Sequence, residues 1–126
     1  MRDKTLIIES LEQLEQVIVT LLESTANIQN IGELPKSADG MLRLHGICMS
    51  FIIIGEEVKR IDKYTEKHFL SNYASISWKN IMGMRDRLAH GYFDIDIDIV
   101  FYALKNDIPP LLEVVKQMKS DLEQDK

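Results

Sequence analysis

The sequence has a single cysteine, no excess of basic residues and no long hydrophobic run. Cys48 cannot form an internal disulfide, and one free thiol in an apolar segment is typical of a reducing compartment, so we expect a cytoplasmic protein. The formal net charge of −5 argues against broad, nonspecific nucleic-acid binding. The longest apolar run, residues 47–54, is interrupted by Ser50 and is far shorter than the ~20 residues that span a bilayer. We therefore expect a soluble chain with no membrane segment.

The composition is that of an ordinary globular protein, with 45% hydrophobic and 28% charged residues. A chain of 126 residues suits one hydrophobic core, so residues 1–126 are predicted to form a single domain. The charge is unevenly distributed: residues 43–90 carry eight Lys or Arg against five acids, and all three histidines. A locally positive cleft on an acidic body favours a small phosphate-bearing target, and solvated helix faces are the plain alternative.

Hydrophobic spacing predicts an all-α fold. The first predicted long helix covers residues 3–25, the second runs from Ser37 or Asp39 to Lys63, the third covers residues 77–91, and the last follows Asn106 or Asp107. Loops are expected at residues 27–39 and 64–77. Residues 47–54 are apolar on all sides, which predicts that the second helix is central and the most buried. Residues 93–99 alternate as a strand would, but their aspartates suit a helix start, so we expect a short helix at 96–105. The result is an antiparallel helical bundle of four long helices plus a short one.

Arg85 falls inside the apolar arc of the helix predicted at 77–91. A guanidinium directed at a core must find a partner or meet a large desolvation cost. Arg85 is therefore either half of a buried ion pair, for which Glu56 is the candidate partner, or part of a functional site.

Asp86 and His90 are four residues apart and share one face of that helix. An aspartate in this position can accept the Nδ1 proton of the histidine and raise the basicity of its other nitrogen, as in acid-base catalysis. Gly91 is typical of a helix C-terminus, which leaves His90 and Tyr92 near an accessible end.

No metal site or cofactor is predicted. His45 has no second histidine at metal-ligand spacing, and it is more typical of a satisfied core histidine. The acidic run at 94–98 lacks the glycine turn that a loop of oxygen ligands requires.

The pattern Arg85-Asp86-x-x-x-His90-x-Tyr92 resembles the Arg-polar-x3-His-x-Tyr signature of HepT-like toxins of the HEPN superfamily. Residues 54–57, 78–84 and 107–112 resemble the same family, so the likeness covers nearly the whole chain, and it supports the helix at 96–105. Asp86 stands where many relatives carry asparagine, a position at which the superfamily tolerates a polar residue.

The resemblance implies a metal-independent endoribonuclease that acts on RNA as a homodimer, the toxin of a HEPN/MNT toxin–antitoxin system. Its implied partner is a nucleotidyltransferase antitoxin of the MNT type, which in related systems adenylylates the motif tyrosine, here Tyr92. The plain alternative for Tyr92 is an amphipathic tyrosine at a helix end.

RNA cleavage by its own 2′-hydroxyl needs a base, an acid and a cation. His90 can be base or acid, Arg85 can stabilise charge, and Asp86 can orient His90. Because one histidine cannot easily do both jobs, a two-fold dimer would supply the second. The alternative is a non-enzymatic helical module that binds a nucleotide or protein, in which the three side chains form a buried polar network.

Overall fold

The part of the chain that this computed structural model describes, residues 4–66 and 68–124, consists of α-helices and short 3₁₀ helices without any strand. The α-helices are α1 (Lys4–Thr25), α2 (Ala38–Tyr64), α3 (Trp78–Gly91), α4 (Ile97–Asn106) and α5 (Ile108–Gln124). The 3₁₀ helices are η1 (Ile31–Lys36), η2 (Leu70–Asn72) and η3 (Tyr92–Asp94). The prediction of an all-α bundle with four long helices and one short helix is confirmed. Residue 3, where the first helix was expected to begin, lies outside the described residues.

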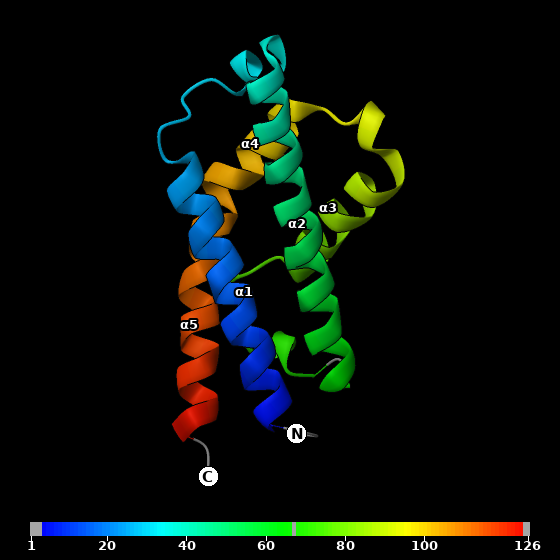
Figure 1. Ribbon diagram of the computed structural model, residues 1–126. Helices are drawn as coiled ribbons and strands as arrows, with labels where there is room; N and C mark the ends of the chain where they lie inside the picture. The colour runs from blue at the N-terminus through cyan, green and yellow to red at the C-terminus, as the bar shows by residue number, and fades with distance from the viewer. Residues whose placement is uncertain (1–3, 67, 125–126) are drawn as a thin grey trace.

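The helices pack as a bundle in which α2 is shared by two neighbours. Figure 1 shows α1 beside α5 and antiparallel to it, with α2 descending next to α1. Helix α3 packs along α2, and the short helix α4 crosses behind the upper part of α2 before the chain turns down into α5. The start of α1 and the end of α5 therefore lie at the same end of the molecule.

Polar side chains fix where α2 and α4 begin. The Gly40 backbone N–H donates to Ser37 Oγ at 3.0 Å, which caps α2. The Asp98 N–H donates to Asp96 Oδ1 at 2.9 Å, which caps α4. Such a cap satisfies a donor that the helix itself leaves free. The strand-like alternation at 93–99 is thus resolved into η3, a cap and the first turn of α4.

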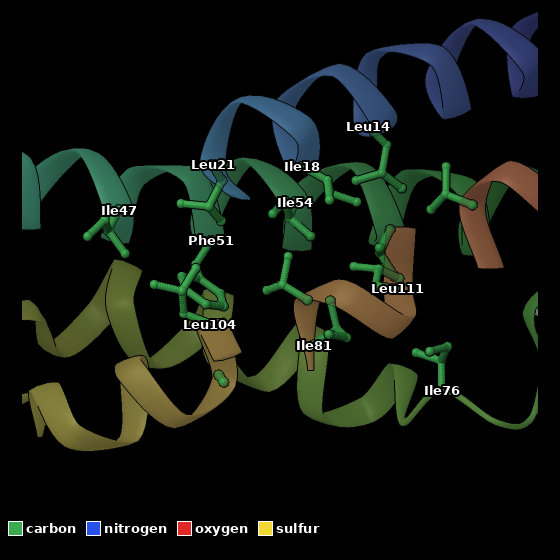
Figure 2. Packing of buried hydrophobic residues seen from close by; sticks show 14 of the residues in the cluster. Leu14, Ile18, Leu21, Ile47, Phe51, Ile54, Ile76, Ile81, Leu104 and Leu111 are labelled. Atoms are coloured by element: carbon green, nitrogen blue, oxygen red, sulfur yellow. The ribbon is translucent and has the colours of Figure 1, made fainter. Parts of the chain in front are cut away.

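A single hydrophobic cluster joins all five helices. Figure 2 shows side chains from each of them meeting between the ribbons. They include Leu14, Ile18 and Leu21 of α1, Ile47, Phe51 and Ile54 of α2, Ile81 of α3, Leu104 of α4 and Leu111 of α5. Full burial of a leucine or isoleucine contributes about 1.5–3 kcal/mol. The cluster therefore fixes the position of α3, the helix that carries Arg85, Asp86 and His90.

Helix α2 is the central helix, as predicted, with α1, α3 and η1 packed against it, but one of its sides is exposed. Its side chains are exposed by 69% at Leu42, 54% at Met49 and 39% at Ile53. The reason is that α1 and α3 cover two sides of α2 and leave the third uncovered. Helix α2 is also the one described helix that is long and apolar enough to cross a membrane, and its packing between α1 and α3 is that of a core helix.

Candidate active site on the third helix

Gly55 brings α3 into close contact with α2 at Arg85. A Cβ atom added to Gly55 would lie 2.2 Å from the Cβ of Arg85, so only glycine allows this approach of the two helices. The Arg85 stem packs over this position, and its guanidinium forms an ion pair with Glu56 through Nε. The predicted pair is present, and the Arg85 side chain is 23% exposed. Arg85 Nε is buried and not aligned with Glu56 for a hydrogen bond, so the attraction is between charges.

Asp86 is held by two cations and not by His90. Its Oδ1 accepts a hydrogen bond of 2.6 Å from Lys59 Nζ and one of 3.0 Å from Arg85 Nη1. These contacts, with Lys59 the stronger, hold the pKa of the Asp86 carboxyl below its usual value. The predicted Asp86–His90 hydrogen bond is not formed, because Lys59 stands one turn after Glu56 on α2 and reaches Asp86 across the helix interface.

His90 is exposed, and its imidazole makes no hydrogen bond or ion pair within the described residues. It lines a hollow of about 580 Å³ between α3 and α4, together with Arg87 and Ile99. Its imidazole is therefore available to a ligand. Arg85 faces α2 while His90 faces this hollow, so one protomer directs the two head groups to different sides.

The Tyr92 ring packs against the side of α2 that no helix covers. Its ring meets His45 edge-on, with ring centroids 5.5 Å apart. Burial, with a smaller contribution from nearby Cys48, raises the pKa of the Tyr92 hydroxyl. His45 itself is exposed, so its prediction as a core histidine is wrong. Since His45 and Gly55 are ten residues apart on α2, Tyr92 and Arg85 contact α2 at points about 15 Å apart.

Cys48 is buried, and desolvation raises its pKa to about 11. A thiol with that pKa stays protonated near neutral pH and is a poor nucleophile.

The sequence interpretation missed Gly55 and Lys59. Both carried a signal: a glycine inside an apolar helix indicates a close approach of backbone, and Lys59 follows Glu56 by one turn and shares its face.

No group of three His, Cys, Asp or Glu side chains that could hold a metal occurs among residues 4–66 and 68–124.

Several curated proteins are similar to this chain. A protein of Caldanaerobacter subterraneus subsp. tengcongensis named "Putative RNase TTE0752" is 40% identical over 78 residues, which are 61% of this chain and 62% of that protein. "Putative RNase MJ0125" of Methanocaldococcus jannaschii is 36% identical over 72 residues, 57% of this chain and 59% of that protein. "Probable ribonuclease HepT" of Thermococcus cleftensis is 37% identical over 59 residues, 47% of this chain and 50% of that protein.

The chain thus spans about three fifths of the length of the first of these relatives. No solved structure matches it significantly. The family model described as "Ribonuclease HepT-like" matches residues 7–118, a range that includes every helix that builds the site. With that match over most of its length, the chain belongs to the HepT-like ribonuclease family.

Proposed function

We propose that this protein is an endoribonuclease that cleaves RNA without a metal ion, and that it acts in the cytoplasm as a toxin. The observation that carries the proposal is His90. Its imidazole is exposed, unpaired within the described residues, and set in a hollow five residues beyond an ion-paired arginine. Membership of the HepT-like family and the ribonuclease names of the relatives support the same activity.

The chemistry uses the RNA's own 2′-hydroxyl. A base removes its proton, the 2′-oxygen attacks the adjacent phosphorus, and the bond from phosphorus to the 5′-oxygen breaks as an acid protonates that oxygen. The products are a 2′,3′-cyclic phosphate and a free 5′-hydroxyl. His90 supplies the proton transfer, and the Arg85 guanidinium stabilises the charge on the phosphorane oxygens. Asp86 and Glu56 hold that guanidinium in place.

A homodimer completes this site. One His90 cannot easily serve both the attacking and the leaving oxygen, which lie on opposite sides of the phosphorus, and in one protomer Arg85 and His90 face different sides. The uncovered stripe of α2, which presents Leu42, Met49 and Ile53, offers an apolar surface for a second copy. Because a two-fold interface brings the same patch of both chains together, it would set two motifs on one cleft.

Adenylylation of Tyr92 by a nucleotidyltransferase antitoxin of the MNT type is the proposed control. Tyr92 follows His90 by two residues in the sequence. The phosphate of a nucleotide added to its hydroxyl would therefore lie at the edge of the site, where its negative charge would repel RNA. The support is the partly exposed ring of Tyr92 beside His45. After incubation with the nucleotidyltransferase and ATP, mass spectrometry should find an added AMP on the wild-type protein and none on Tyr92→Phe. An adduct on Tyr64 or Tyr102, with activity lost, would contradict this control.

A non-enzymatic binding module is the competing function. The observation that favours it is that Arg85 already pairs with two carboxylates, Glu56 and Asp86, as a structural arginine would. In that case His90 would have no role in turnover.

RNA cleavage by His90→Ala decides between the two functions. The variant should lose at least ~10²-fold in rate, the usual contribution of general acid-base catalysis, because His90 is exposed and its loss leaves no cavity. Wild-type cleavage should persist in EDTA and leave 2′,3′-cyclic phosphate ends by mass spectrometry. Lys116→Gln on α5 is the control, because Lys116 lies outside the hollow that His90 lines. Arg87→Gln is unsuitable as a control, because Arg87 lines that hollow. Equal cleavage by wild type and His90→Ala would remove His90 from the mechanism.

A further inference from the structure

A continuous groove runs along α3 on the side that faces α4. It is made of two adjoining hollows of about 580 and 410 Å³, which share Met84, Arg87 and Ile99 in their walls. Each hollow falls within the range of about 300–1,000 Å³ that small-molecule sites occupy. His90 lies at one end of the groove and Lys79 at the other.

The α3 wall of this groove follows helical spacing. Lys79, Gly83 and Arg87 are four residues apart, and His90 is three residues further, so all four share one face. At 1.5 Å per residue, Lys79 and His90 are separated by about 16 Å along the axis. This length exceeds what one phosphate group needs, so the groove can take several consecutive units of a chain.

Two unpaired cations lie on this wall. Lys79 and Arg87 form no ion pair among the described residues, whereas Lys59, Arg60 and Arg85 are each paired with a carboxylate. Gly83 lies between the two cations on this wall, and a Cβ added to it would meet nothing within 4 Å. The space in front of the wall is therefore open at this point. Unpaired cations beside open space are available to phosphate oxygens.

The α4 wall has a different chemistry. Tyr102 is 66% exposed and presents an aromatic side chain to the groove. Asp94 and Asp96 line the groove at the His90 end, and Asp107 lines it at the Lys79 end. Carboxylates repel phosphates but accept hydrogen bonds from the exocyclic amino groups of bases, and aromatic rings stack on any base. The two walls therefore suit a strand whose phosphates follow α3 and whose unpaired bases face α4.

We infer that this groove binds the single-stranded RNA that flanks the scissile phosphate at His90. Lys79 and Arg87 bind its phosphates, and Tyr102 stacks on a base. This inference rests on the proposed nuclease function for the identity of the ligand. A duplex is excluded because its bases are paired and cannot turn toward Tyr102 and the aspartates.

The test measures binding separately from cleavage. A fluorescein-labelled 2′-O-methyl oligonucleotide of about ten nucleotides cannot be cut, and fluorescence anisotropy gives its Kd. Tyr102→Ala should weaken binding about tenfold. Lys79→Gln should lower the slope of log Kd against log salt by about 0.7, the contribution of one phosphate contact on a single strand. Gly83→Leu should block the groove and weaken binding at least as much as Tyr102→Ala.

Three comparisons keep the result interpretable. Lys116→Gln, a matched loss of an exposed lysine on α5, should leave the salt slope unchanged. A duplex of the same length should bind more weakly than the single strand. On cleavable RNA, the groove variants should lose activity on the oligonucleotide while retaining it on a dinucleotide.

Wild-type Kd and salt slope in Tyr102→Ala and Lys79→Gln would overturn the inference, even if the wild type cuts RNA. A change of oligomeric state in these variants by sedimentation, with RNA affinity intact, would assign the groove to a protein interface. If the wild type cuts nothing but the groove variants lose RNA binding, the nuclease proposal fails and the groove stands.

Discussion

At the scale of single residues, Gly55 sets how closely α3 can approach α2. The neighbouring Arg85 Cβ belongs to a helix and cannot swing away as the end of a long side chain can. At this helix separation, Arg85 forms its ion pair with Glu56.

Gly55→Ala should therefore destabilise the protein by about 1–3 kcal/mol, the usual cost of overpacking, although alanine favours a helix. Urea denaturation measures the change. Gly83→Ala is the matched control, because it is also a glycine inside a helix but has open space around it. It should leave stability unchanged or raise it by up to about 1 kcal/mol. Equal effects at the two positions would contradict the close contact at Gly55.

Asp86 gives the stability of the fold a dependence on acid pH. Lys59 and then Arg85 hold the pKa of its carboxyl below the ordinary value. A lowered folded-state pKa adds stability that is present above the unfolded pKa of about 3.9 and is lost as the pH falls through the folded value. Asp86→Asn should accordingly show a shallower loss of Tm between about pH 5 and 2 than the wild type. Glu23→Gln, at an exposed position without an ion pair among the described residues, should keep the wild-type acid profile.

At the scale of helices, Tyr73 ties the segment before α3 to α5. Its hydroxyl donates to Asp121 Oδ2 at 2.6 Å, and Gln117 donates to the other oxygen of that carboxylate. Burial and then the Asp121 carboxylate raise the pKa of Tyr73 above its usual value. Because the pKa is raised in the folded state, this stability is present below the unfolded pKa of about 10 and is lost as the pH rises through the folded value.

Tyr73→Phe should cost about 1 kcal/mol at pH 7, the net value of one hydrogen bond, and should reduce the further loss of stability above about pH 10. Urea denaturation at neutral and alkaline pH measures both effects. Tyr102→Phe removes a hydroxyl that makes no hydrogen bond within the described part of the chain, and it should change neither. A Tyr73→Phe curve that matches the wild type at both pH values would show that the tie does not hold α5.

The helices were the predictable part of the fold. Helix α3 was expected at 77–91 and is Trp78–Gly91, and α4 was expected at 96–105 and is Ile97–Asn106. Spacing of apolar residues and polar caps such as Asp96 are local properties, so a sequence contains them directly.

The less predictable part depended on which helices become neighbours. Met49 and Ile53 look like core residues in the sequence, but no helix covers their side of α2. Asp86 could equally face His90 or a cation, and only the packing of α2 on α3 brings Lys59 within 2.6 Å. The Arg85–Glu56 pair was predictable because an arginine in an apolar arc requires a partner.

At the scale of the whole molecule, the central claim is that one active site uses two copies of the motif. A single chain presents one His90, and it directs Arg85 and His90 to different sides. A dimer formed through the uncovered stripe of α2 would resolve both points, because the one shared cleft would then contain two histidines.

Mixed dimers test this claim most directly. Wild type and His90→Ala are combined in varied ratio at constant total protein, dissociated, allowed to reassociate at random, and assayed for RNA cleavage. If a site needs both His90 residues, activity follows the square of the wild-type fraction, and an equal mixture retains about a quarter of the wild-type rate. Sedimentation must show a dimer at the assay concentration. Activity proportional to the wild-type fraction, about half in the equal mixture, or cleavage by a 14.5 kDa monomer, would contradict the account.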